Sequence, residues 1–413
     1  MDLVIRNARI RGESSLRDIG IQDGKIVAIK DTIKDSCDFE VAAGGRLTVP
    51  GFVNTHIHLD KCLTGERTRS AYSAGSLDII PAAAQVKKQF SVEDIISRAL
   101  RCLKLAVSHG TTAIRTFADV DSIGGLTAVK ALLEVKKRVQ HDIYVDIVAF
   151  PQEGILTDPQ AEELLHKAME LGANIVGGIP WYEMIDEDAK KHIDIVFEIA
   201  KKYDSDIHML IDDTDDPDSR TLHYYAIKTI REGYEGRVSA SHCGALAAYN
   251  DVYAKKVISL VKRAGMTIVA NPHISLMLGG RMDKQPIRRA ITRVKELAQN
   301  GVNVASGQDD VDDPYYPFGR ADMLEIAHFM THAAQLNSPP EIDLAFDVVT
   351  SNGARALRLQ DYGIGIGRQA DLVILDAQSV GEALRMQSDK RWVIKGGKIV
   401  AETQRSTKLN MIW

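Results

Sequence analysis

The sequence has no run of apolar residues close to the roughly 18 that a membrane-spanning helix needs. Its first residues, MDLVIRNARI, do not show the basic and then apolar pattern of a signal peptide. No two of its four cysteines have CxxC spacing. We therefore predict reduced thiols and not a disulfide framework. We therefore expect a cytoplasmic protein with no membrane partner.

The sequence also lacks a large excess of charge of either sign. Its 51 Lys and Arg residues face 56 Asp and Glu residues, which gives a formal net charge of −5. This balance supplies no global basic field and argues against nucleic acid as a partner. With 413 residues, 45% of them hydrophobic, the chain can bury a large core. A charged helical face at residues 134–139 is compatible with a homo-oligomer, although such faces are usually solvated.

The two ends of the chain are both rich in short β-like runs. Residues 3–49 hold such runs between turns such as Asp23-Gly24, and the C-terminal part holds ADLVILDA followed by RWVIKGGKIVAE. The pair Gly396-Gly397 in the last string predicts a hairpin. We predict that the two ends form one small sheet domain together.

Between these ends, from about residue 51 to 355, strand-like runs alternate with segments of helical period, which is typical of repeated βα units. There are eight such runs: FVNTHIH, TAIRTFADV, IYVDIVAF, NIVGGIP, DIHMLID, RVSASH, TIVANP and NVASGQDD. Eight units with no GxGxxG after the first strand favour a closed (β/α)8 barrel over an open doubly wound sheet. In such barrels the catalytic groups lie at the C-terminal ends of the strands, and here those ends carry several histidines and acids.

His56 and His58 alternate with Ile57 on the first strand, so both imidazoles face the same side, one pleat apart. Two ligands of one metal ion are placed in this way, although an isolated HxH pair also arises from two polar residues at a strand end. An acid, Asp309, closes the eighth run. The alternative for Asp309 is an N-cap of a following helix, a role that Asp310 could fill instead.

The strings PGFVNTHIHLDK, FPQEGIL, SASHCGA, ANPHISLMLGGR and GQDDVDDPYYPFG resemble the bacterial cytosine deaminase branch of the metal-dependent amidohydrolase superfamily. The resemblance covers nearly the whole chain. It implies a (β/α)8 TIM-type barrel at residues 51–355, inserted in a small β-sandwich built from residues 1–50 and 356–413. It also implies one divalent metal ion, zinc or iron, at the barrel mouth.

The resemblance also implies roles for single residues. His56 and His58 match metal ligands, and Asp309 matches the ligand that takes a proton from bound water, which the metal acidifies. His242 matches a histidine beside the metal that holds the nucleophile or the tetrahedral oxygen; its alternative is a core histidine bonded to backbone. Gln152 matches a glutamine that reads the amide edge of the substrate ring, because a primary amide offers both a donor and an acceptor.

The fifth strand departs from the family pattern, which ends there in His-x-x-Glu. Alignment through DDPDSR puts Leu210 at the histidine and Asp213 at the glutamate, so one metal ligand is missing. His208 faces the same way but lies about 6.6 Å further down the strand, and it can bind the metal only through a bulge or shift. Otherwise three protein ligands remain, with His242 or water completing the shell. Asp213 is the expected proton carrier, with Asp212 as the alternative.

Two further departures concern the pocket. Tyr315 and Gln308 stand where the family carries tryptophan and histidine, and we expect both to contact the substrate, with altered stacking and hydrogen bonding. Lys61 adds a positive charge near the metal if it points inward, although a lysine on a barrel loop is more often solvated.

The leading hypothesis is a metal-dependent hydrolytic deaminase of an amino-substituted nitrogen heterocycle, cytosine or a related pyrimidine, triazine or pterin, that releases ammonia. The second is an amidohydrolase that cleaves an N-alkyl aminotriazine or a cyclic amide with the same metal chemistry. The third, motivated by Leu210, is a metal-free relative that only binds a ligand.

Overall fold

A parallel barrel and a smaller sheet domain make up the protein, and a computed structural model describes residues 1–68, 79–288 and 291–411 of it. The eight barrel strands are hydrogen-bonded in sequence order from β6 to β13. They are β6 (Phe52–Ile57), β7 (Thr111–Asp119), β8 (Tyr144–Phe150), β9 (Ile175–Gly178), β10 (Asp206–Ile211), β11 (Val238–His242), β12 (Thr267–Val269) and β13 (Asn303–Ala305). All eight predicted strand runs are confirmed, and so is the (β/α)8 fold class.

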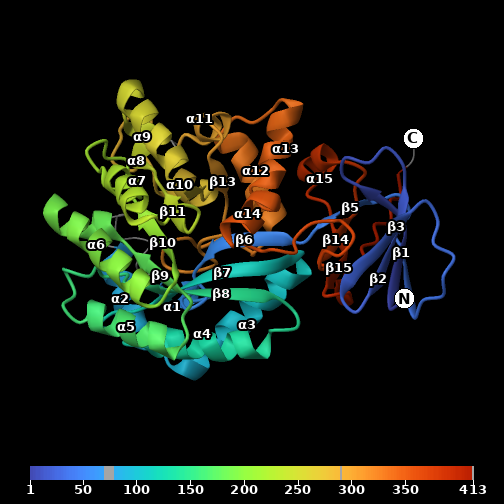
Figure 1. The fold of residues 1–413 in the computed structure, drawn as a ribbon, viewed down its shortest axis with the longest axis horizontal. Helices are drawn as coiled ribbons and strands as arrows, with labels where there is room; N and C mark the ends of the chain where they lie inside the picture. The colour runs from blue at the N-terminus through green and yellow to red at the C-terminus, as the bar shows by residue number, and fades with distance from the viewer. Residues whose placement is uncertain (69–78, 289–290, 412–413) are drawn as a thin grey trace.

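Helices surround the barrel strands (Figure 1). They are α1 (Gly65–Thr68), α2 (Ile79–Lys87), α3 (Val92–Ser108), α4 (Thr127–Arg138), α5 (Ala161–Leu171), η3 (Pro180–Tyr182), α6 (Asp186–Lys202), α7 (Thr221–Glu232), α8 (Ala245–Ala248), α9 (Asp251–Arg263), α10 (Pro272–Leu278), α11 (Val294–Gln299), α12 (Met323–Ala333), α13 (Pro339–Asp347) and α14 (Ser351–Ala356).

Helix α3 shows why the sequence forms helices at these places. The Ser91 side chain accepts a hydrogen bond from the Asp94 N–H and so caps the first turn. Ile95, Ala99 and Cys102 recur at the spacing of one helical face, and all three are buried. The helix therefore packs this face against the barrel.

The barrel closes between its first strand and the segment that follows its last strand. The Asp309 N–H donates to the His56 carbonyl at 2.7 Å, and the His58 N–H donates to the Asp309 carbonyl at 2.9 Å. Below them, the Thr55 hydroxyl donates to the Ser306 carbonyl at 2.9 Å. This seam fixes the two histidines of the first strand directly beside Asp309.

The second domain joins strands from both ends of the chain, as predicted. Its sheet holds β1 (Leu3–Ile10), β2 (Arg17–Gln22), β3 (Lys25–Lys30), β4 (Phe39–Ala42), β5 (Leu47–Pro50), β14 (Leu372–Leu375), β15 (Lys390–Lys395) and β16 (Lys398–Glu402), with helix α15 (Val380–Met386) beside them. Strand β5 connects the halves, because it pairs with β1 on one side and β14 on the other. Figure 1 shows both chain termini in this domain.

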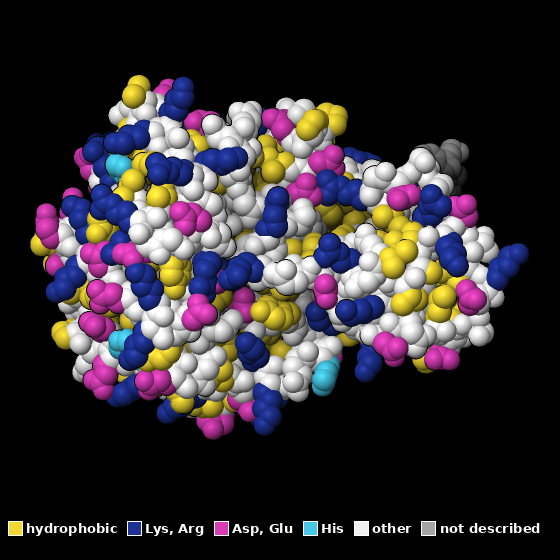
Figure 2. All heavy atoms as spheres, viewed as in Figure 1, with side chains coloured by type: hydrophobic (Ala, Val, Ile, Leu, Met, Phe, Trp, Pro, Cys, Tyr) yellow, Lys and Arg dark blue, Asp and Glu magenta, His cyan; other side chains and the backbone are white. Residues whose placement is uncertain are grey.

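The surface carries charges of both signs. On the face shown in Figure 2, Lys and Arg side chains are interspersed with Asp and Glu side chains. No helix in the described part of the chain is long and apolar enough to span a membrane.

We predict that the core shared by the two chain ends stabilises the fold. Ile374 of β14 is 0% exposed and packs in one cluster with Ile5 and Ile19 from the N-terminal strands. Ile374→Ala is expected to lower the free energy of unfolding by about 2–5 kcal/mol, because it removes buried methyl groups and leaves a cavity. Denaturant titration measures this loss. Ile366→Ala, at a side chain 71% exposed, is the control, with an expected change within about 0.5 kcal/mol; equal losses would contradict the prediction.

Candidate active site

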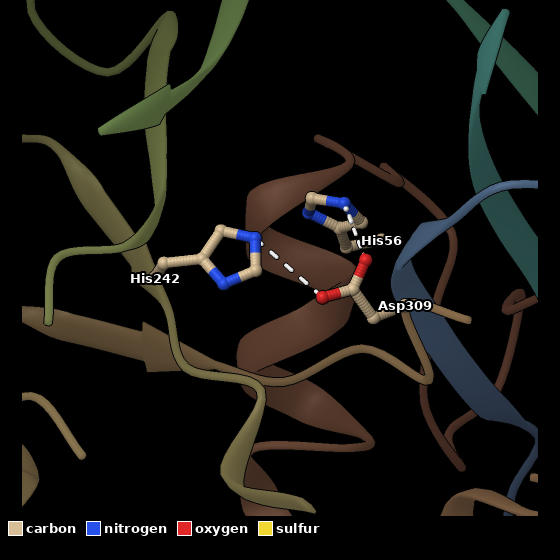
Figure 3. Close-up of side chains that lie close together, drawn as sticks. All are labelled: His56, His242 and Asp309. Atoms are coloured by element: carbon tan, nitrogen blue, oxygen red, sulfur yellow. Dashed lines mark ion pairs between the residues drawn. The ribbon is translucent and has the colours of Figure 1, made fainter. Parts of the chain in front are cut away.

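Four side chains from three strand ends gather at the mouth of the barrel. The Nε2 atoms of His56 and His58 lie 3.2 Å apart, and they lie 3.1 and 3.4 Å from Oδ1 of Asp309. The other carboxylate oxygen of Asp309 lies 3.5 Å from Nε2 of His242. Figure 3 shows that His56 and His242 approach this carboxylate from two sides.

These donors fit a divalent metal ion. Ligand bonds of 2.0–2.1 Å in a tetrahedral arrangement place neighbouring donor atoms roughly 3.3–3.4 Å apart, close to the spacing among His56, His58 and Asp309. Both ring nitrogens of His242 are buried without a hydrogen bond to any described residue, and such an orphaned pair calls for a partner. His56, His242 and Asp309 also form a group with metal-binding spacing.

Burial and neighbouring charges keep these residues in their metal-binding protonation states. Burial lowers the pKa of the His58 imidazole well below its usual value, and the positive charge of Lys61 lowers it further. Burial alone would raise the pKa of Asp309, but the adjacent His56 and His242 hold it below its usual value. The lowered pKa values of His56 and His58 favour neutral imidazoles, and Asp309 is an ionised carboxylate, the forms that bind metals.

The backbone is strained where it presents these side chains. His242 has a φ of 68° and Asp309 a φ of 59°, a left-handed conformation that few non-glycine residues adopt and that is common at functional sites. The N-cap alternative for Asp309 and Asp310 is wrong, because the next helix, α12, begins at Met323 and is capped by Asp322.

The fifth strand contributes an apolar side chain instead of a ligand. Leu210 lines the pocket and belongs to an apolar cluster with Phe117, Phe150 and Ile179. The structure does not bring His208 to the metal-binding group: it lies deeper in the barrel, where its Nε2 is 2.7 Å from the Ser241 hydroxyl. No bulge or shift interrupts the pairing of β10 with β11. Of the two alternatives for the missing ligand, replacement of Leu210 by His208 is thus absent from the geometry.

The two acids after β10 have different surroundings. Oδ1 of Asp213 lies 3.3 Å from Nδ1 of His242, and the residue lines the pocket. Burial raises the pKa of Asp213 above its usual value, and Asp309 and Asp215 raise it further although His242 opposes them. Asp212, the alternative carrier, instead accepts hydrogen bonds from the backbone N–H groups of residues 221 and 222 at the start of α7. Asp213 is therefore the acid that faces the cavity.

The cavity above the donors has a volume of about 270 Å³, below the roughly 300–1,000 Å³ of pockets for drug-sized ligands. Its lining is partly polar and partly apolar. The polar lining includes His58, Gln152, Asp213, His242, Asp309, Asp310 and Tyr315, and the apolar lining includes Ile179, Trp181, Leu210, Ile274 and Leu278. The size suits a small ring with one polar and one apolar side.

Lys61 points inward and fixes the orientation of Gln152. Its Nζ donates to Oε1 of Gln152 and to Oδ1 of Asp119, both at 3.0 Å. Burial alone would lower the pKa of Lys61, but Asp119 and Asp60 raise it well above its usual value, so Lys61 is a cation at neutral pH. Because Lys61 occupies Oε1, the amide of Gln152 is left to donate from Nε2 toward the pocket.

A second buried lysine supports this arrangement. Nζ of Lys87 lies 2.8 Å from Asp119, 2.6 Å from Asp121 and 3.2 Å from Glu153. Two lysines thus share the Asp119 carboxylate, which satisfies charges that would be costly to bury alone. The sequence gives no sign of this role, because Lys87 is the last residue of α2 and is followed by Lys88, a place where lysines are usually solvated.

The two other predicted substrate contacts have different outcomes. Tyr315 lines the pocket, with Nζ of Lys61 5.7 Å from its ring centroid. Gln308 does not: its amide lies 3.3 Å from Nε2 of His273 and donates to the Asp310 carbonyl. The Gln308 backbone follows the last strand, but its side chain turns toward α10, away from the cavity lining.

Trp181 is a pocket residue that sequence reasoning missed. It lies in η3, directly after the fourth barrel strand β9, and therefore at the C-terminal end of a strand like the other site residues. Trp181 follows the predicted strand in the string NIVGGIPWY, two residues beyond Ile179. This position at the end of a strand is the signal that could have identified it.

Glu183 holds the loop that carries Gln152. Its carboxylate accepts hydrogen bonds from the backbone N–H groups of Ile155, Leu156 and Thr157. Its Oε1 also lies 2.7 Å from Nδ1 of His192 on α6. This clamp ties the loop after β8 to the end of β9, because Nε2 of His192 accepts from the Ile179 N–H.

The comparisons with known proteins agree with this geometry. The amidohydrolase family profile matches residues 81–401. The N-isopropylammelide isopropyl amidohydrolase of Pseudomonas sp. (strain ADP) is 32% identical over 98% of both chains, and the pterin deaminase of Rhizobium rhizogenes is 31% identical over 85% of this chain and 80% of its own. The crystal structure of 5-methylcytosine deaminase from Klebsiella pneumoniae with 5-fluorocytosine superposes with a TM-score of 0.93, at 36% identity, over 98% of this chain and 99% of that one.

We predict that the Glu183 clamp weakens in acid. Burial would raise the pKa of Glu183, but the hydrogen bonds from His192 and the loop lower it from 4.5 to about 2. A carboxyl group whose pKa is lower in the folded state stabilises the fold at pH values above its pKa in the unfolded state. This contribution is lost as the pH falls through the pKa of the folded state. The difference in unfolding free energy between wild type and Glu183→Gln should therefore shrink as the pH falls from 4.5 toward about 2. Denaturant titrations at several pH values measure it; Glu235→Gln, at an exposed site, should show no such trend.

Proposed function

The chain belongs to the amidohydrolase family, and on that basis we propose that it is a metal-dependent deaminase of a small aminopyrimidine such as cytosine or 5-methylcytosine. The reaction adds water to the ring carbon that bears the exocyclic amine. A C–O bond forms, the C–N bond breaks, and ammonia leaves, with water supplying the oxygen and the protons. One divalent ion, zinc or iron, suits the imidazole and carboxylate donors.

One observation carries this proposal. The metal-binding group of His56, His58 and Asp309 lies at the floor of a cavity sized for one small ring, and a hydrogen-bonding amide, Gln152, faces the same cavity. A bound divalent ion supplies Lewis acidity and lowers the pKa of water at that point. The remaining chemistry falls to side chains of the chain itself.

Asp213 and His242 are the proposed proton-handling pair. His242 lies between two carboxylates, 3.3 Å from Asp213 and 3.5 Å from Asp309, so it can donate to an oxygen that develops negative charge. The raised pKa of Asp213 suits a group that receives a relayed proton and delivers it to the leaving amine. Asp309 is the proposed first acceptor, because it is held ionised at the floor of the cavity.

The pocket walls support a pyrimidine with a carbonyl on one side. Gln152, held by Lys61, presents its N–H to an acceptor such as the ring carbonyl oxygen. Leu210, Ile179 and Trp181 form an apolar part of the lining that suits ring C–H groups or a methyl substituent. The similarity to 5-methylcytosine deaminase over 98% of the chain favours the same ring class.

A second candidate is hydrolysis of an N-alkyl aminotriazine. The 32% identity to N-isopropylammelide isopropyl amidohydrolase across 98% of both chains motivates it, and the metal chemistry is the same. The leaving group distinguishes the two, since deamination of an aminopyrimidine releases ammonia and the triazine reaction releases an alkylamine.

The first prediction here concerns metal and product. Purified protein should contain about one zinc or iron per chain and release ammonia from cytosine or 5-methylcytosine, as elemental analysis and an ammonia assay would measure. His58→Ala should lose metal and activity together, because it removes one of the converging donors. His141→Ala, at an exposed surface site, should retain both. Wild-type protein that takes up neither ion after reconstitution would contradict the proposal and leave the ligand-binding alternative.

Asp213 provides a test that separates proton transfer from metal binding. Asp213→Asn should keep the metal but lower kcat by about 100-fold or more, as expected for loss of a positioned acid–base group. Steady-state kinetics on metal-loaded protein measure the effect. Asp218→Asn, five residues away with a side chain 82% exposed, should leave kcat unchanged. Normal turnover by Asp213→Asn would assign proton transfer to another group.

A further inference from the structure

The histidine that does not reach the metal-binding group is connected to it by one hydroxyl. Nδ1 of His56 lies 2.6 Å from Oγ of Ser241, and the same oxygen lies 2.7 Å from Nε2 of His208. His56 and His208 are both 0% exposed, as is Ser241. The three side chains thus form a buried series that begins at a proposed ligand and runs down the barrel axis.

Arg115 determines the direction of hydrogen bonding in this series. Its Nη1 lies 3.5 Å from Nδ1 of His208, and a guanidinium has donors only. The ring nitrogen facing it must therefore carry the lone pair, which leaves the His208 proton on Nε2, directed at Ser241. Asp146 holds Arg115 in place at 3.3 Å and is itself held by Asn174 at 2.6 Å.

The orientation of His208 restricts what Ser241 can do. A hydroxyl oxygen has two acceptor positions, and one of them receives the His208 proton. The same hydroxyl bonds Nδ1 of His56 at 2.6 Å, so Nε2 of His56 faces the point that His58 and Asp309 also face, at 3.2 and 3.1 Å. The ring orientation that a metal ligand needs is therefore held from its Nδ1 side.

We propose that His208 is a positioning residue which, through the Ser241 hydroxyl, holds the His56 imidazole in the orientation that directs its Nε2 at the metal-binding group. It would compensate for the ligand lost at Leu210 by strengthening a ligand that remains. The inference rests on the metal-dependent part of the proposed function. It excludes direct ligation by His208, whose Nε2 is engaged by Ser241 and whose ring centroid lies 5.8 Å from that of His56.

The experiment compares zinc affinity in three variants of the full-length, metal-free protein by competition with a chromogenic chelator. His208→Leu removes the donor to Ser241 and should weaken zinc binding by about 10–100-fold, the usual effect of losing such a partner. His208→Gln retains an N–H donor near the position of Nε2 and should bind zinc within a few-fold of wild type. Ser241→Ala should weaken binding as His208→Leu does.

A double variant and a spectrum distinguish positioning from general stability. His208→Leu combined with Ser241→Ala should bind zinc about as well as either single variant, because both substitutions break one connection. The cobalt-loaded His208→Gln protein should have the visible absorption spectrum of wild type. His192→Leu, at another fully buried histidine, should lower the melting temperature of the metal-free protein without changing its zinc affinity.

Several results would overturn the proposal. These are wild-type zinc affinity in His208→Leu or in Ser241→Ala, equal losses in His208→Leu and His208→Gln, or a changed cobalt spectrum in His208→Gln, which would indicate direct ligation. If His208→Leu does not fold, Ser241→Ala and His208→Gln decide alone. Absence of zinc binding by the wild-type protein would instead refute the proposed function itself.

Discussion

The site depends on how the barrel closes. Parallel strands leave their carboxyl ends at one rim, and only closure brings the first strand next to the last. Here the backbone of Asp309 pairs with the backbone of His56 and His58, so the same hydrogen bonds that seal the barrel also set three donor side chains within 3.4 Å of one another. The strained φ of Asp309 is tolerated because these hydrogen bonds hold its backbone on both sides.

Much of the fold and part of the site could be predicted from the sequence. The eight runs between residues 51 and 355 identified the barrel because strand and helical periods alternate there, and the turn at Gly396-Gly397 identified the last hairpin. His56, His58, His242 and Asp309 could be placed together because strand ends converge in a barrel. These inferences needed only the direction of the chain and the alternation of side chains along a strand.

The contacts that could not be predicted from the sequence depend on where side chains from different strands point. Lys61 and Lys87 resemble solvated lysines, and only the shared Asp119 carboxylate explains their burial. Gln308 lies at the correct place in the chain, but its amide is bound by His273 and the Asp310 carbonyl. The depth of His208 followed from strand geometry, whereas its connection to His56 requires Ser241 on the neighbouring strand, which no local pattern reveals.

A leucine instead of a ligand at position 210 changes both the number of donors and the apolar lining of the pocket. An imidazole there would add a metal donor, whereas the leucine extends the apolar wall of Phe150 and Ile179. The pocket thus has one potential donor fewer and a larger apolar surface. Its buried lysine and aspartate network supplies fixed polar groups beside His58, because His58, Asp60 and Asp119 lie close together.

The shared sheet of the two chain ends has a consequence for biosynthesis. Ile5 and Ile374 occupy one core, so the first strands cannot complete their packing until the ribosome has made nearly the whole chain. At about 5–20 residues per second, that interval lasts on the order of tens of seconds. Throughout it, β5 lacks its partner β14 and offers an unpaired edge of the kind that drives aggregation. The order in which this protein folds is therefore set by the last segment to leave the ribosome.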